Sequence, residues 1–176
     1  NTQNRYVEWG GGLTDFDNDG FTDLMYVTGN VYPEIERAFA EYPHRGPRVL
    51  FRNRDGVRFD DVTAVSGATS VAHSSRGAAF GDIDNDGDVD VLIMNMNEPP
   101  SLLRNEYRGN NNWIEIALEG RRSNRAAIGA TVIVTTGSRK QARAVLSQSS
   151  YYSHDDLRLH FGLGRATRVD ELEVRW

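Results

Sequence analysis

Two short stretches of the sequence carry carboxylates at alternate positions. They read DFDNDGFTD at residues 15–23 and DIDNDGDVD at residues 82–90. Residues two apart on an extended chain share one face, so these like charges would repel one another at close range. A bound hard cation would remove that repulsion, which makes both loops candidate metal sites. The carboxylates concerned are Asp15, Asp17, Asp19 and Asp23 in the first loop and Asp82, Asp84, Asp86 and Asp90 in the second.

The spacing within each loop suits calcium. Calcium takes about six to eight oxygen ligands, and oxygens at the first, third and fifth positions of a tight loop can converge on one point. The glycine that follows, Gly20 or Gly87, permits the sharp turn. The backbone carbonyl of the next residue, Phe21 or Asp88, then points inward. The sequence therefore predicts two calcium sites, one in each loop.

The loops are not EF-hands, because that motif needs an acidic ligand at its twelfth position and a helix on either side. Tyr26 and Ile93 stand at that position here. We expect Asp23 and Asp90 to close the two cages instead, and Asp88 to contribute only its backbone. All-oxygen ligation disfavours zinc, and magnesium demands stricter octahedral geometry. The alternative interpretation is a pair of solvated acidic turns that bind no metal.

The elements around the loops form an internal repeat. Residues 9–30 match residues 76–97, each with a lead-in, an aspartate loop and an apolar run, and VLFRN at 49–53 matches SLLRN at 101–105. The first copy carries an insertion in which Glu34 to Glu41 is predicted to form a short helix after a proline. The remaining segments are short, rich in Val, Ile, Tyr and Phe, and predict strands.

The composition changes after Asn105, and no further aspartate loop follows. We place a boundary there, with residues 1–107 forming two propeller-type repeats and residues 108–176 a small β-sandwich or barrel. The predicted fold class is all-β, with about two blades of a partial propeller ahead of that β domain. The strands predicted in the second part are residues 113–118, 130–136, 141–146, 157–161 and 169–176.

The bulk composition indicates a globular chain. It has 176 residues, 39% hydrophobic residues and a net charge of −5, and no apolar run approaches the roughly 20 residues of a membrane span. It has no cysteine, which excludes disulfides and thiolate metal sites but leaves the compartment open. No targeting segment is visible, and two blades would leave open sheet edges. We therefore expect a fragment of a longer chain rather than an obligate assembly.

Some residues could suggest catalysis or anion binding. His73 lies beside two serines and His154 beside two aspartates, but triads are defined by geometry across a fold, and no catalytic motif is present. We expect no enzyme activity, with His160 on an outward strand face. Basic residues on two loops could hold an acidic polysaccharide if the loops adjoin, although solvated turns are the simpler interpretation. These residues are Arg121, Arg122 and Arg125 on one loop and Arg139, Lys140 and Arg143 on the other.

The aspartate loops resemble the calcium-binding FG-GAP/VCBS repeats of integrin α-subunit propellers. LFRNRDGVRFDDVTAVSGA (50–68), RGAAFGDIDNDGDVDVLIMN (76–95) and the segments NNWIEIALEGRRSNRAAIGATVIV and LRLHFGLGRATRVDELEVRW extend the resemblance to nearly the whole chain. Together they resemble the cartilage acidic protein-like family, in which such repeats precede an ASPIC/UnbV domain. The resemblance implies a secreted or cell-surface calcium-binding protein with a β-propeller and an all-β appendage.

The leading functional hypothesis is an extracellular adhesion or scaffolding module in which calcium is structural. Its partners would be calcium and proteins or polysaccharides at the cell surface. We expect no nucleic acid, because the chain lacks a broad basic surface with stacking aromatics, and no membrane span, because its apolar runs are short. One alternative is a subunit of a self-assembling surface polymer or filament that pairs through blade edges. Another is an accessory domain of a secreted enzyme.

Overall fold

The computed structural model describes residues 6–68 and 70–176. Its N-terminal part contains two antiparallel sheets, with strand orders β1-β2-β3-β4 and β5-β6-β7. Each sheet begins with a hairpin whose turn is an acidic loop, as the repeat predicts. The strands are β1 (Glu8–Thr14), β2 (Asp23–Gly29), β3 (Arg45–Arg54), β4 (Arg58–Asp61), β5 (Ser75–Gly81), β6 (Asp90–Asn95) and β7 (Ser101–Leu103).

The two N-terminal sheets share one apolar core. In β6, Val91 and Ile93 are buried while Leu92 and Met94 are exposed, the alternation expected of a strand with one covered face. Strands β1 and β5 pack against each other, so the two repeats bury their inner faces together. The core cluster consists of Met25, Val27, Ala78, Phe80, Val89, Val91 and Ile93.

The insertion in the first repeat forms a single helical turn. Helix α1 spans Ile35–Ala38, which is shorter than the helix predicted over Glu34 to Glu41. No side chain caps its N-terminus at Glu34, and none of its residues is buried. A short helix without capping or tertiary packing does not repay its nucleation cost, which explains why the turn does not extend.

The C-terminal part is a small β-sandwich. A three-stranded sheet, β10-β9-β12, faces a two-stranded sheet, β11-β8. Val132 and Val134 of one sheet and Phe161 of the other are among the most deeply buried side chains in the chain and belong to one core cluster. The strands are β8 (Asn112–Ile116), β9 (Thr131–Thr136), β10 (Arg139–Ala144), β11 (Leu159–Gly164) and β12 (Glu171–Arg175).

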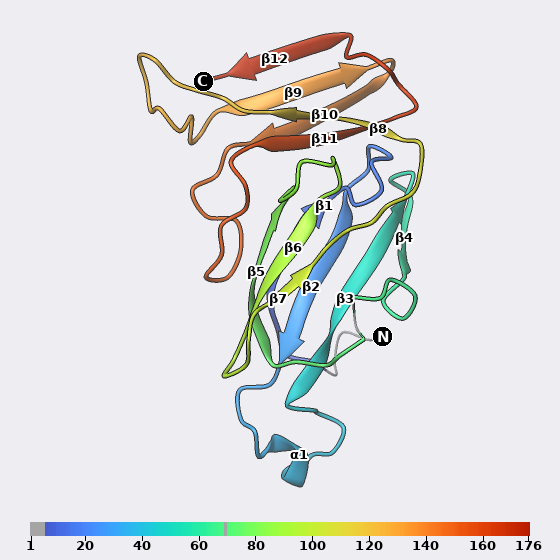
Figure 1. The fold of residues 1–176 in the computed structure, drawn as a ribbon, viewed down its shortest axis with the longest axis vertical. Coiled ribbons are helices and arrows are strands. Elements are labelled where there is room, and N and C mark those ends of the chain that lie inside the picture. Colours follow the sequence, from blue (N-terminus) through green and yellow to red (C-terminus); the bar gives the residue numbers. More distant parts are fainter. Residues whose placement is uncertain (1–5, 69) are drawn as a thin grey trace.

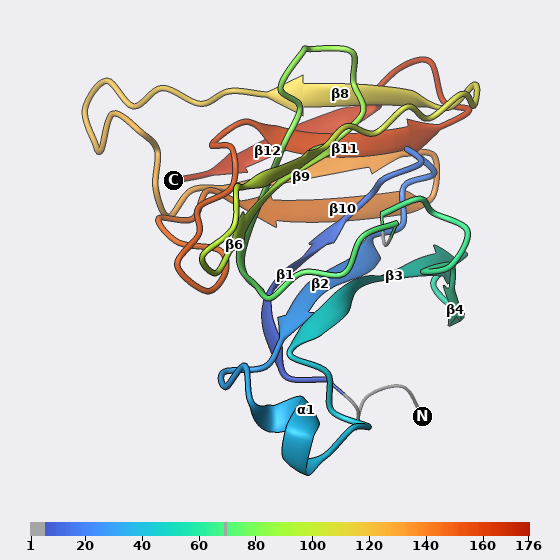
Figure 2. The ribbon, with the colours of Figure 1, turned by 60° about the horizontal axis from the view of Figure 1, so that its bottom comes forward.

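The sandwich lies across one end of the two repeat sheets. Figure 1 shows β8 to β12 above the ends of β1, β2, β5 and β6, whereas α1 lies at the opposite end of the molecule. Figure 2 shows the molecule after rotation, with β8 to β12 above β1, β2 and β3 and with α1 at the far end from the sandwich. The end that the sandwich covers is the end that carries the acidic loops.

The architecture confirms the predicted fold class. Every sheet formed by residues 6–68 and 70–176 is antiparallel and open, as expected for blade-type sheets that make up part of a propeller. In the same residues, no helix is long and apolar enough to cross a membrane.

Candidate metal centres

The ends of the hairpin strands position both acidic loops. Asp23 pairs with Thr14 as β2 begins, and Asp90 pairs with Gly81 as β6 begins. The last carboxylate of each pattern therefore lies on a strand, and the first follows directly after one. Ladder hydrogen bonds hold the two ends of each loop together, so the loop must form a compact turn.

Three carboxylates converge in each loop. In the first loop, carboxylate oxygens of Asp15, Asp17 and Asp19 lie within 4.8 Å of one another. In the second loop, carboxylate oxygens of Asp82, Asp84 and Asp86 lie within the same distance of one another. Hard cations bind such clusters of oxygen ligands, so the residues present fit calcium. The predicted first, third and fifth ligands are thus brought together in both copies.

A matching set of backbone hydrogen bonds shapes both loops. Asp15 accepts a bond from the Gly20 amide at its Oδ2 atom (2.7 Å), and Asp82 accepts one from the Gly87 amide in the same way (2.8 Å). Both glycines have φ near +90°, at 92° and 90°. This region of backbone space is readily open only to glycine, which explains why both loops require it.

The ninth-position carboxylates bind backbone amides of neighbouring segments. Asp23 accepts the amides of Phe16 (3.1 Å) and Asn53 (2.8 Å), one at each oxygen. Asp90 accepts the equivalent amides, from Ile83 (3.1 Å) and Asn105 (2.8 Å). Neither carboxylate belongs to the three-carboxylate clusters found among the described residues. Their role as closing ligands stays a prediction, and the structure gives them a second role in tying each loop to its sheet.

The seventh-position residues also hold matching places in the two loops. The Phe21 amide donates to Asp19 Oδ1 (2.8 Å), and the Asp88 amide donates to Asp86 Oδ1 (2.9 Å). These bonds fix the backbone immediately before each carbonyl that we predict to be a ligand. The carbonyl ligation itself stays a prediction.

Burial makes the metal-free first loop electrostatically unfavourable. Burial raises the pKa of Asp15 to about 7, with a further increase from its aspartate neighbours that the Gly20 amide partly offsets. Burial likewise raises the pKa of Asp23 to about 6 and, in the second loop, that of Asp88 to about 6. A raised carboxyl pKa means that the surroundings disfavour the charged form. A cation in the loop would remove that penalty.

Each loop also contacts an arginine at the equivalent place in its repeat. Arg52 of β3 pairs with Asp17, and Arg104, which follows β7, pairs with Asp84 at 2.6 Å. No hydrogen bond of good geometry reaches Asp17 Oδ2, so the first pair is an ion contact only. The sequence analysis missed these arginines. Their signal was the Arg-Asn pair shared by VLFRN and SLLRN.

The sandwich contacts both loops, through the side chain of Asn18 and through backbone carbonyls. His160 Nε2 lies 2.6 Å from Asn18 Oδ1, and the Gly164 amide donates to the Asn18 carbonyl (2.8 Å). On the second loop, Arg158 donates to the Asp82 carbonyl (2.6 Å). These contacts join residues far apart in the sequence, so the sequence pattern could not indicate them.

One further arginine closes over the first loop. Arg139 donates to the Asp19 carbonyl, and its guanidinium carbon lies 4.0 Å from the centroid of the Phe21 ring. A cation placed over an aromatic face is attracted by the ring. The sandwich therefore contacts the loop through charge as well as through backbone hydrogen bonds.

The remaining candidate residues are dispersed. His73 Nδ1 lies 2.5 Å from Glu98, and the one hydrogen bond of the exposed His154 among the described residues joins its Nδ1 to the Asp155 carbonyl. His160 lies on the outer face of β11, opposite the buried Leu159 and Phe161, and that face meets the first acidic loop. The strand position was foreseen, and the contact was not.

The predicted basic loops do not form one surface. Arg121 lies in the segment before β9, whereas Arg139 follows the turn after β9 and contacts the first acidic loop. Arg139 pairs with Thr136 at the end of β9, whereas Arg143 pairs with Val132 near the start of that strand. The second predicted group is therefore spread along β10 and does not form one loop beside the first group.

The fold and the loops define an all-β protein with repeated acidic hairpin turns, and comparisons with known proteins agree. Residues 15–93 match the family model described as FG-GAP-like repeat, and residues 120–176 match the model for ASPIC and UnbV. The chain thus carries these two segments in the order expected from its sequence.

The same comparisons find cartilage acidic protein 1 as a relative. Identity to the human protein is 29% over 165 residues, which cover 92% of this chain and 24% of the human protein, and the mouse protein gives the same figures. The protein of Xenopus tropicalis is 37% identical over 57 residues, or 32% of this chain and 9% of that protein. The chain spans about a quarter of the length of the human and mouse relatives. The resemblance to this family is confirmed.

Proposed function

We propose that the chain is a calcium-binding extracellular module without enzyme activity, in which each acidic loop holds one structural calcium ion. The observation that supports this proposal most directly is the convergence of three carboxylates in both loops. Calcium accepts irregular cages of about six to eight oxygens, whereas zinc prefers nitrogen and sulfur and magnesium keeps an octahedron of mostly water. The loops offer oxygen alone.

The structural role follows from what the loops connect. Each ion would bind between two strands of a hairpin, and the backbone carbonyls of Asn18 and Asp82 on the outer side of the loops accept hydrogen bonds from the sandwich. Calcium would therefore fix the shape of the hairpin and of the surface that the sandwich contacts. A module of this kind suits adhesion or scaffolding, where shape rather than chemistry is required.

Extracellular conditions suit such sites. Calcium sites of extracellular modules have dissociation constants of about 0.1 to 1 mM. At millimolar calcium, a site at the tight end of that range adds roughly 1.4 kcal/mol of stability by mass action. The lack of cysteine also suits a module that relies on metal rather than disulfides for stability.

Calorimetric titration and thermal melting test this function. We expect about two calcium ions per chain and a higher melting temperature in calcium than in chelator. Asp17→Asn and Asp84→Asn should each remove one ion. Glu34→Gln is a matched control, because it removes the same charge from an exposed site far from both loops. Binding of no calcium, or equal melting in calcium and chelator, would contradict the proposal.

The outer face of the second blade favours a second candidate function, association with another blade. Leu92 and Leu102 are cross-strand partners, and Met94 lies two residues from Leu92 on the same face. These side chains are 43%, 56% and 51% exposed, in that order. The occupant would be another blade of a longer chain or a second copy in a polymer. Light scattering of the chain and of Leu92→Glu tests the second case, since self-association that persists in the variant excludes this face.

A further inference from the structure

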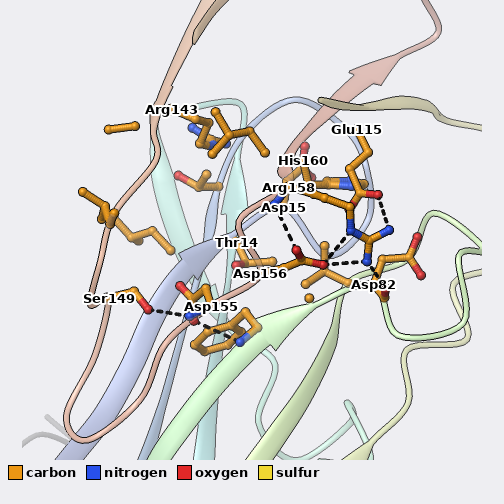
Figure 3. Close-up of a pocket in the computed structure, with 18 of the residues that line it drawn as sticks. Thr14, Asp15, Asp82, Glu115, Arg143, Ser149, Asp155, Asp156, Arg158 and His160 are labelled. Atoms are coloured by element: carbon orange, nitrogen blue, oxygen red, sulfur yellow. Dashed lines mark hydrogen bonds and ion pairs between the residues drawn. The ribbon is translucent and has the colours of Figure 1, made fainter. Parts of the chain in front are cut away.

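A cavity lies between the two repeats and the sandwich. Its volume is about 330 Å³, and its walls include Leu13 of β1, Phe80 of β5, Arg143 of β10 and His160 of β11. Figure 3 shows side chains from both parts of the chain around it, with the segment that carries Ser149 and Asp155 forming one side. The cavity is at the small end of the range for ligand pockets, which is about 300 to 1,000 Å³.

Most charged groups around this cavity are paired with protein groups. Arg158 donates to Asp156 (2.7 Å) and to Glu115 (2.6 Å), and Figure 3 shows these bonds as dashed lines. Asp155 accepts the amide of Phe80 (3.0 Å). These side chains form a wall of the cavity, and their hydrogen bonds are already made to protein groups.

His160 presents an unused acceptor. Its partner Asn18 donates through Nδ2 to the Gly87 carbonyl (3.0 Å), so the Oδ1 atom of Asn18 is the one that faces His160 Nε2. That oxygen is an acceptor, and Nε2 must therefore carry the ring proton. Nδ1 then has a free lone pair. It is buried and has no hydrogen-bond partner among the described residues.

Arg143 presents unused donors. Its only hydrogen bond among the described residues goes to the adjacent Ala142 carbonyl at 3.3 Å, and its guanidinium lies 5.6 Å from the centroid of the Phe161 ring. No carboxylate of the described residues forms an ion pair with it, and burial lowers its pKa. A guanidinium has five N–H donors, so the described residues leave most of its hydrogen-bonding capacity unused, and the side chain lines the cavity.

We propose that this cavity binds a neutral polyhydroxyl ligand, one sugar unit of a glycan. The oxygen of one hydroxyl accepts from Arg143, and a neighbouring hydroxyl donates to His160 Nδ1 once the ligand displaces the protein atoms that cover this nitrogen in the free chain. Leu13 and Leu146, 62% and 52% exposed, provide apolar contact for the C–H face of the ring. Carboxylates outnumber guanidiniums around the cavity, which disfavours an anionic ligand. This inference goes beyond the proposed calcium function and uses different side chains.

The test is a titration of the isotope-labelled chain, in calcium-containing buffer, with a panel of neutral sugars and with glucuronate. The panel contains glucose, galactose, mannose and N-acetylglucosamine. We expect at least one neutral sugar to shift the amide signals of residues 13–15 and 142–149. Arg143→Met should lower the affinity for that sugar by about tenfold or more, because the substitution removes charged donors while keeping a side chain over Phe161.

Arg121→Met is the matched control, since Arg121 is exposed in the segment before β9 and should leave sugar binding unchanged. His160→Phe keeps a ring against Trp113, which stacks on His160 at 5.9 Å, and should weaken binding as well. Well-dispersed amide signals verify that each variant folds. No shift with any sugar, shifts elsewhere, a preference for glucuronate, or unchanged binding by Arg143→Met would overturn the proposal. Calcium titration of the same samples separates such a failure from a failure of the metal sites.

Discussion

The two acidic loops share a hydrogen-bond pattern but not an environment. In the first loop, Asp15 and Asp17 are buried and Asp19 is half-buried. In the second, Asp82 is buried but both Asp84 and Asp86 are exposed. The repeated sequence thus gives the same turn twice, and the rest of the fold covers only one of them closely.

The sandwich causes this difference. Strand β11 passes so near the first loop that a Cβ atom at Gly162 would overlap the Asp15 carboxylate and lie 2.7 Å from the Asn18 backbone. The second loop meets the Trp113 ring beside Gly87 and the tip of Arg158 instead. The comparison teaches that the nine-residue pattern determines the conformation of a loop. Segments distant in the sequence determine how deeply its carboxylates are buried, and therefore the free-energy penalty of ionising them.

The largest expected effect comes from the two glycines. Gly20→Ala and Gly87→Ala both place a side chain at φ near +90°, which costs roughly 1 to 2 kcal/mol for an L-residue. A Cβ at Gly20 would overlap the flexible tip of Arg139, whereas one at Gly87 would overlap the Trp113 indole ring. We expect Gly87→Ala to destabilise more, by about 2 to 4 kcal/mol in denaturant unfolding, because the ring cannot withdraw as the arginine can.

Gly137→Ala is a suitable control for this pair. It also has positive φ, but a Cβ there would meet nothing within 4 Å. It should show the backbone cost alone. If Gly20→Ala and Gly87→Ala unfold no more easily than this control, the close contact between sandwich and loops is wrong.

The next largest effect is the pH dependence of stability that Asp15 of the first loop gives to the metal-free protein. The folded-state pKa of Asp15 is raised to about 7 from an ordinary 3.8, so the folded chain holds this proton more tightly than the unfolded chain. Stability of the metal-stripped protein should therefore be highest below about pH 4 as far as this group is concerned, and fall as pH rises toward about 7. Melting of the stripped protein across this range measures the fall.

Calcium should reverse that trend, because the ion binds the ionised carboxylates and protons compete with it. Asp15→Asn should reduce the pH dependence of the metal-stripped protein, because the asparagine is neutral in the folded and unfolded states, and should leave the part that Asp23 and Asp88 contribute. Glu34→Gln should leave the dependence in place. A stripped protein that becomes more stable with rising pH in this window would contradict the electrostatic account of the first loop.

Much of the fold could be predicted because its signals are local. The repeated turn marked two hairpins, and alternating apolar residues marked the sandwich strands, of which residues 130–136 correspond to β9 at Thr131–Thr136. The predicted helix over Glu34 to Glu41 shortened to Ile35–Ala38, because helix propensity without packing does not hold a helix. Sequence patterns report local preference, and tertiary contacts decide the boundaries.

The site was only half visible from sequence. Its acidic residues follow a spacing that any hard-cation loop requires, so their convergence could be foreseen. The contacts of Asn18 with His160 and of Asp82 with Arg158 join segments more than 70 residues apart, at separations of 142 and 76. No period or motif encodes such contacts. The unused groups of Arg143 and His160 depend on them, and therefore also lay beyond sequence reasoning.

The smallest expected effect tests the arginines at equivalent positions of the repeats. Arg52→Met removes the cation beside Asp17, and Arg104→Met removes the one beside Asp84 and Asp86. Each guanidinium neutralises a loop without metal and competes with calcium for the same oxygens. Exposed ion pairs of this kind contribute about 0.2 to 1 kcal/mol, so each variant should bind calcium up to a few-fold more tightly in its own loop.

Arg52→Met should raise calcium affinity more than Arg104→Met does. The Arg52 side chain is 38% exposed against 56% for Arg104, and Asp17, the partner of Arg52, is buried. An ion pair nearer the interior is less screened by water and salt. Site-resolved calcium titration measures the change in affinity that each variant causes, and raised salt should widen the difference between the two changes, because it screens the more exposed Arg104 pair more strongly. Equal changes in the two loops would mean that the closer cover over the first loop does not affect its charges, and the contrast between the loops would then be one of shape alone.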